Sequence, residues 1–177
     1  LTPINHCMPG FVAIMEGRNS DALPHYQKFF KMDPYNAFAA WSYGYVLLRS
    51  GRVDEASNVV GDLKLNHPDS IMAQLGHAIL CGFCGKHEAA RDALSGQLRG
   101  AAKKSELLSR EITHCLALAG ETEEALDWLE NTVQIGNINY PFWAQHNEWV
   151  DSIRGNSRFD GIMRNVEREW LSVTFDG

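Results

Sequence analysis

Hydrophobic and polar positions along the chain follow the period of an α-helix. Between residues 37 and 49, four residues share one helical face at spacings i, i+3, i+4 and i+7: Ala40, Tyr43, Gly44 and Leu47. Gly51 then ends the predicted helix, as glycine does where the backbone needs a positive φ. A second helical stretch opens at Val53 or Asp54 and stops before Pro68. The pattern predicts two helices joined by a tight turn.

This helix pair recurs with a nearly constant period. Each of four segments has a glycine that is followed five residues later by an alanine. The glycines are Gly17, Gly51, Gly85 and Gly120, which are 34, 34 and 35 residues apart. The alanines are Ala22, Ala56, Ala90 and Ala125, at the same intervals. Because one helix pair cannot bury both of its faces, we expect the pairs to stack into an all-α solenoid.

The repeated unit resembles the tetratricopeptide repeat, which has a period of ~34 residues. Gly44, Leu47, Ala56 and Pro68 stand where that repeat has a glycine, a large residue, an alanine and a proline. The resemblance covers about residues 3–139 as four units, at about 3–36, 37–70, 71–105 and 106–139. It implies an α-α superhelix that binds other proteins.

The chain departs from the repeat near both of its ends. Pro9 falls inside the first helix, which we expect to be short or broken there. Thr113 and Asn137 replace the small residue and the proline of the fourth unit. Residues 140–177 have no fifth Gly–Ala pair, so we expect them to cap the solenoid.

The capping region is predicted to have short helices near 141–153 and a longer helix from about 156 to 172, with Asn156 or Ser157 as its N-cap. One apolar stripe follows that helix: Phe159, Ile162, Met163, Val166 and Trp170. Residues 137–141 and 153–159 are also similar to the ends of bacterial tetratricopeptide regions fused to Ser/Thr kinases, adenylate cyclases or transcriptional activators. This resemblance implies a scaffold within a larger bacterial signalling protein. A chain that starts at Leu1 instead of Met fits that expectation.

The face opposite the packing stripe predicts a binding site. In stacked helix pairs, the first helix of each pair lines a concave face. We expect this face to form an apolar groove for a peptide or helix of a partner, since it carries aromatic and arginine side chains. The predicted groove residues are Phe38, Trp41, Tyr45, Leu48, Arg49, Met72, Leu75, Ile79, Phe83, Arg110 and His114. The first unit adds Phe11, Ile14 and Met15, and the fourth adds Leu107, Ala117 and Leu118.

A structural interpretation of the same face stays open. The stripe would then pack against neighbouring helices, against the chain's own tail or against a second copy in a homodimer. Substitution distinguishes the two interpretations. Changing Phe38, Trp41 or Tyr45 to alanine abolishes partner capture at unchanged melting temperature if the face binds, and unfolds the protein if it is core.

Four potential zinc ligands, His77, Cys81, Cys84 and His87, fall within eleven residues. The repeat register nevertheless places His77 and Cys81 on the packing stripe, where a cysteine acts as a small apolar residue. It places His87 in the turn after Gly85, and no second Cys-x-x-Cys motif follows. A metal site is therefore a less favoured alternative, and we expect no cofactor.

The acidic residues near Glu121 fit the first turn of a helix. The sequence has no phosphate-binding loop and no ordered set of Ser, His and Asp residues typical of a catalytic triad. We therefore expect no enzyme activity. The net charge of -6 argues against a nucleic-acid partner. The four cysteines lie mostly in apolar helical stretches, which favours a reducing, cytoplasmic compartment. No signal peptide or apolar run of the ~18 residues that indicate a membrane span is visible, so we expect no membrane contact.

Overall fold

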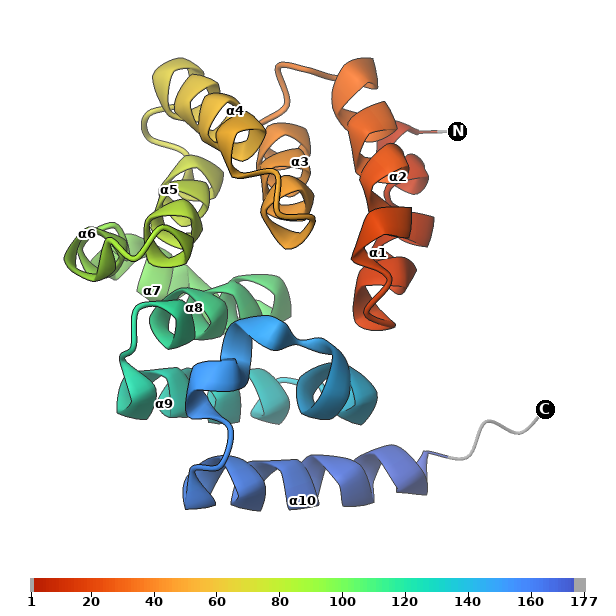
Figure 1. Ribbon diagram of the computed structural model, residues 1–177, viewed down its shortest axis with the longest axis vertical. Helices are drawn as coiled ribbons and strands as arrows, with labels where there is room; N and C mark the ends of the chain where they lie inside the picture. Colours follow the sequence, from red (N-terminus) through yellow and green to blue (C-terminus); the bar gives the residue numbers. More distant parts are fainter. Residues whose placement is uncertain (1, 174–177) are drawn as a thin grey trace.

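Helices make up the regular structure of residues 2–173, the part of the chain that the computed structural model describes (Figure 1). The repeat region contains η1 Pro3–His6, α1 Met8–Met15, α2 Asn19–Met32, α3 Ala37–Arg49, α4 Val53–Asn66, α5 Ile71–Phe83, α6 His87–Asp92, α7 Gly96–Ala102, α8 Glu106–Leu118 and α9 Thr122–Gln134. The end of the chain contains η2 Phe142–His146, η3 Glu148–Ile153 and α10 Ser157–Ser172. Successive helix pairs stack side by side, α2 on α3, α3 on α5 and α5 on α8, so the predicted all-α solenoid is confirmed.

The repeated glycines and alanines have the roles that the sequence predicts. The φ angles of Gly17, Gly51, Gly85 and Gly120 are 74°, 71°, 72° and 76°. A side chain at these turns would strain the backbone, since residues with a Cβ rarely adopt a positive φ. The repeated alanines are 0–1% exposed, at Ala22, Ala56, Ala90 and Ala125. Small residues at these positions let the two helices of each pair cross closely.

The third repeat differs from the other three because its second helix is divided. Two short helices, α6 and α7, take the place of one continuous helix. Ser95 begins the second of them, and its Oγ accepts a hydrogen bond from the backbone N–H of Leu98 at 3.2 Å. The same hydroxyl donates to Oε1 of Gln74 at 2.7 Å, which holds the break against α5. The repeat register alone did not predict this division.

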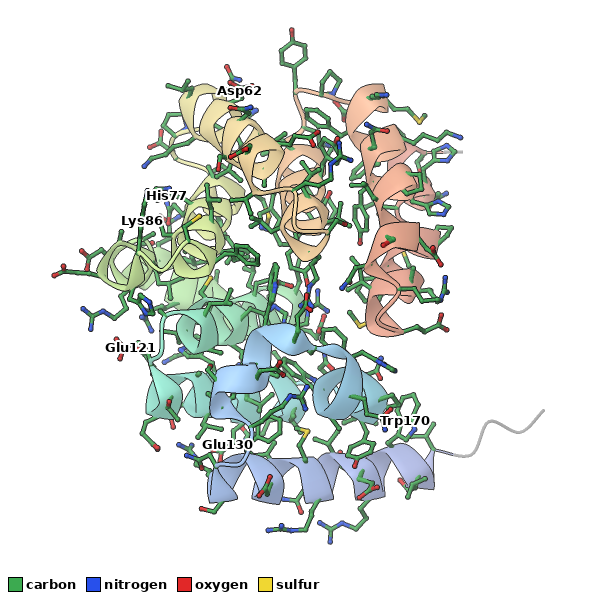
Figure 2. All side chains as sticks on the ribbon, viewed as in Figure 1. Asp62, His77, Lys86, Glu121, Glu130 and Trp170 are labelled. Atoms are coloured by element: carbon green, nitrogen blue, oxygen red, sulfur yellow. The ribbon has the colours of Figure 1, made fainter. Side chains whose placement is uncertain are left out.

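The helices at the two ends of the described chain have the form that the sequence predicts. The 3₁₀ helix η1 stops at His6, and α1 starts at Met8 with Pro9 in its first turn, where the missing N–H breaks no helical hydrogen bond. Asn156 caps α10, and its Oδ1 accepts from the N–H of Arg158 at 2.8 Å. The apolar stripe of α10 is buried except for Trp170, which is 36% exposed near the end of the helix (Figure 2).

The segment between α9 and α10 is not a regular helix. It consists of a π-helical turn, η2, and a 3₁₀ helix, η3. Figure 1 shows it lying in front of α8 and α9, on the side that faces α1. We call Phe142–Ile153 the tail segment. Within residues 2–173, no helix has both the length and the apolar character needed to cross a bilayer.

Candidate functional site

The predicted concave face is in contact with the tail segment over part of its length. The Trp149 ring packs edge-on against Tyr45 of α3, with centroids 5.0 Å apart, and against Phe83 of α5 at 6.1 Å. The guanidinium of Arg49 lies 4.0 Å from the Trp149 ring centroid. Ser152 donates to the carbonyl of Ala117 in α8 at 2.7 Å. The tail segment therefore touches the first helices of the second, third and fourth repeats.

Buried hydrogen bonds fix the position of the tail segment. Arg49 Nη2 donates to Asn147 Oδ1 at 2.8 Å, which orients the amide of Asn147, because arginine can only donate. The amide Nδ2 then donates to His114 Nε2 at 2.9 Å. With Nε2 as an acceptor, Nδ1 of His114 carries the proton and donates to Glu111 Oε2 at 2.9 Å. Both ring nitrogens of His114 are thus occupied by contacts within the protein.

The charges in this network are balanced by close partners. Burial lowers the pKa of His114 to about 4, although Glu111 acts in the opposite direction. Burial alone would raise the pKa of Glu111, but His114 and Arg110 hold this pKa below its ordinary value. Arg110 donates to Glu111 at 3.0 Å and to Glu106 at 2.9 Å. At neutral pH the cluster holds a neutral imidazole beside an arginine cation that two carboxylates share.

Arg49 has a different environment from Arg110. Its Nε donates to the hydroxyl of Tyr45 at 3.0 Å, and its other bonded partner is the neutral amide of Asn147. The rings of Tyr45, Phe142 and Trp149 lie 5.3, 5.8 and 4.0 Å from its guanidinium carbon. Within the described part of the chain, its Nη1 is buried without a hydrogen-bond partner. Aromatic faces and neutral hydrogen-bond partners, with no directly bonded carboxylate among the residues that the structure describes, thus surround this buried charge.

Beyond the tail segment, the concave face forms an apolar pocket of about 240 Å³, which we call the open pocket. Residues from α1, α2, α3 and α8 line it, among them Met8, Phe11, Met15, Phe38, Trp41 and Leu107. Phe38 and Trp41 are stacked with centroids 5.6 Å apart. Arg110 also lines the pocket, with its guanidinium 5.5 Å from the Phe11 ring. Tyr45 forms the boundary, because it lines the pocket and also contacts Trp149.

The structure divides the predicted groove residues between distinct environments. Four line the open pocket: Phe38, Trp41, Tyr45 and Arg110. Five others are buried within the described chain: Leu48, Arg49, Leu75, Ile79 and His114. Met72 and Phe83 are half-buried. A ligand that reached Arg49 or His114 would have to displace the tail segment, so the predicted groove is accessible only in its first part.

Several residues near the site were not predicted. The pocket is also lined by Met8, Tyr26 and Glu106. Met8 precedes Phe11 by three residues, so the helical period of α1 could have identified it. Trp149 belongs to the 3₁₀ helix η3, and Asn147 lies between η2 and η3. The sequence of this stretch has no period from which a contacting face could be read.

The four potential zinc ligands do not converge. His77 Nε2 lies 3.7 Å from Cys81 Sγ, while Cys84 is exposed. The ring of His87 turns to another repeat, with Nδ1 at 2.6 Å from the carbonyl of Ala119. In the range 2–173, no group of three or more His, Cys, Asp or Glu side chains is arranged to hold a metal ion. Figure 2 places His77 and the nearby Lys86 on the opposite side of the molecule from α1.

Comparisons with known proteins agree with the helical repeat. Two family models of the tetratricopeptide repeat match the chain, one over residues 13–78 and one over residues 114–131. The comparison with curated proteins gives no match.

Two solved structures have a TM-score of 0.50 to this chain. One is a crystal structure of MamA protein, which is 15% identical and aligns over 99% of this chain and 98% of that chain. The other is a double mutant of MamA RS-1, which is 11% identical and aligns over 97% of both chains. At these identities the similarity concerns the fold alone.

Proposed function

This chain is a tetratricopeptide repeat protein, and from that premise we propose that the open pocket holds a segment of a partner protein. The repeats and the solenoid fold support a protein–protein interaction module. The observation that carries the finer proposal is the open pocket itself. It lies on the concave face, it is mostly apolar, and its charged residues are few.

Exposure at the mouth of the pocket supports binding. Met8 is 52% exposed although it lines an apolar concavity, and Phe11, Met15 and Phe38 are only half-buried. Exposed apolar side chains gathered in a concave site are typical of surfaces that bind ligands or proteins. The proposal is therefore narrower than the predicted groove. It assigns docking to Phe38, Trp41, Tyr45 and Arg110 together with the residues of α1.

The wider context is part of the same proposal. The similarity of residues 137–141 and 153–159 to the ends of bacterial signalling proteins supports a non-catalytic scaffold in such a protein, working in the cytoplasm. The net charge of -6 supports a protein partner over a nucleic acid. No metal or other cofactor has a role in this function.

A second candidate is self-association through α1. Ile4, Met8 and Val12 are 48%, 52% and 48% exposed and lie four residues apart, so they form one apolar strip on the first helices. A second copy that covered this strip would give a homodimer. Light scattering distinguishes the two, because a homodimer should dissociate when Val12, which does not line the pocket, is changed to Lys.

Selection from a random peptide library tests the proposed docking site. Peptides are selected on the native protein and then tested against Leu107→Trp, which narrows the pocket. Leu65→Trp is the matched control, because Leu65 is 81% exposed on α4 and lies outside the pocket. We expect peptides that bind the native protein and Leu65→Trp but not Leu107→Trp. Selected peptides that bind all three proteins equally would show that the pocket is not the docking site.

A further inference from the structure

The tail segment indicates which kind of side chain the open pocket accepts. We propose that the pocket takes an aromatic side chain, above all tryptophan, from a partner segment, and that this ring packs on Phe38 and Trp41 and faces the Arg110 guanidinium. This inference rests on the proposed function and names the chemistry of the partner at that site.

A continuous row of aromatic rings leads from the tail segment to the pocket. Trp149 contacts Tyr45 with centroids 5.0 Å apart, Tyr45 contacts Trp41 at 5.5 Å, and Trp41 contacts Phe38 at 5.6 Å. On the covered side, the chain completes the row with its own tryptophan. On the open side, Trp41 and Phe38 line the pocket. An aromatic ring from a partner would extend the row by the same offset and edge contacts.

The surroundings of the two arginines on the concave face, Arg49 and Arg110, support the same inference. Three rings surround Arg49, and the nearest of them, Trp149, lies 4.0 Å from its guanidinium carbon. Arg110 is close to one ring, that of Phe11, at 5.5 Å. A cation in an apolar site is stabilised by further aromatic faces. An aromatic ring bound in the pocket would stabilise the Arg110 guanidinium in the way that the Trp149 ring stabilises that of Arg49.

The charges beside the pocket argue against other anchors. Arg110 is already paired with Glu111 at 3.0 Å and Glu106 at 2.9 Å, and Glu106 itself lines the pocket. A carboxylate from the partner would meet these two acids, and a lysine would lie beside Arg110. Both would lose water without gaining a new counter-ion. An aliphatic side chain would fill the pocket but gain nothing from Arg110.

Two methionines at the pocket favour the same occupant. Met8 and Met15 line it, and methionine adapts its shape to a bound ring and makes favourable sulfur–aromatic contacts. They also supply a local reporter. The other methionines, Met32, Met72 and Met163, do not line the pocket.

Protein labelled with ¹³C at the methionine methyl groups is titrated with three probes. These are N-acetyl-tryptophan amide, N-acetyl-leucine amide and N-acetyl-glutamate amide, observed by NMR. We expect the tryptophan probe to shift the Met8 and Met15 signals with saturation, while Met32, Met72 and Met163 stay in place. The leucine probe should bind at least about threefold more weakly, and the glutamate probe should produce no saturating shift. Leu107→Trp should remove the tryptophan response, and Leu65→Trp should keep it.

Equal or tighter binding of the leucine or glutamate probe would overturn the aromatic preference but leave the pocket as a docking site. Failure of the tryptophan probe to move Met8 and Met15, or equal shifts at all five methionines, would also overturn the inference. Failure of the proposed function is seen separately, in the peptide selection with Leu107→Trp. That selection does not depend on which side chain anchors the peptide.

Discussion

The concave face has a filled half and an open half that are built from similar residues. In the filled half, Arg49, Phe83 and His114 contact the tail segment. In the open half, Phe38 and Trp41 line a pocket of about 240 Å³. In the sequence the two halves have the same pattern: aromatic and arginine residues on helices that are apolar on two sides. The difference shows that such a face becomes core wherever another part of the chain reaches it, and stays a surface elsewhere.

The halves also differ in how they hold charge. The filled half buries Arg49 against neutral groups and rings, and one of its nitrogen atoms, Nη1, has no partner within the described residues. The open half keeps Arg110 beside two carboxylates. Loss of the tail segment would therefore expose a charge without its partners. A ligand entering the open pocket would leave the existing pairs intact.

The largest effect is expected when the Trp149 ring, which lies at the centre of the filled half, is removed. Trp149→Ala should lower the free energy of unfolding by ~3–5 kcal/mol, because a buried tryptophan is replaced by a cavity. Urea unfolding followed by circular dichroism measures the change. Trp170→Ala is the matched control, since Trp170 is 36% exposed, and it should cost less than ~1 kcal/mol. Similar losses for the two variants would mean that the tail segment is not core.

The next test breaks the polar link in the same half. Asn147→Ala leaves Arg49 Nη2 and His114 Nε2 without a partner, so unfolding should become easier by ~1–3 kcal/mol. Asn165→Ala changes the same residue type on the exposed side of α10 and should stay within about 0.5 kcal/mol of the native protein. Chemical denaturation at pH 7 compares them. An Asn147→Ala variant as stable as Asn165→Ala would contradict the importance of the network.

Acid should destabilise the folded protein, and His114 in the filled half should contribute most of the loss. The pKa of His114 is about 4 in the folded protein, against the ordinary 6.5 of the unfolded chain. Between these values the unfolded state binds more protons, so stability falls as the pH drops, by ~1–2 kcal/mol from pH 7 to pH 5. His77, whose pKa is also lowered by burial, acts in the same direction. Urea titrations of His114→Gln should therefore show a smaller pH dependence, and an unchanged slope would count against the assignment.

The smallest effect is expected in the open half. Met8→Ala removes a side chain that is 52% exposed, so its free energy of unfolding should change by no more than about 0.5 kcal/mol. Binding of the selected peptides should nevertheless weaken, because Met8 lines the pocket. Thermal melting and peptide titration on one preparation test both statements. A loss above ~2 kcal/mol would place Met8 in the core and remove the distinction between the halves.

Local features of the fold could be predicted because local residues specify them. Gly17, Gly51, Gly85 and Gly120 turn the chain through their own φ angles, and Asn156 caps α10 with its own side chain. Ser95 also acts locally. The repeat register predicts one continuous helix there, and the hydrogen bonds of Ser95 divide it instead.

The cover of the concave face could not be predicted in the same way. Helical periodicity identifies Arg49 and Tyr45 as residues of one face, but it carries no information about what packs on that face. The answer depends on Asn147, which lies 98 residues after Arg49 between η2 and η3, and on Trp149 in η3. Both interpretations of the face, binding surface and core, therefore stayed open in the sequence. The core interpretation describes the filled half, and the binding interpretation is our proposal for the open half.

The hydrogen bond between Arg49 and Asn147 joins residues that are 98 positions apart. In an ordinary solenoid each repeat touches only its neighbours, so folding can proceed along the chain as it is synthesised. Here α3, α5 and α8 leave the ribosome before the segment that covers part of their inner face. The closing step thus waits until residues 142–153 have been made. Removal of the tail segment would therefore destabilise the second repeat, which lies far from it in the sequence.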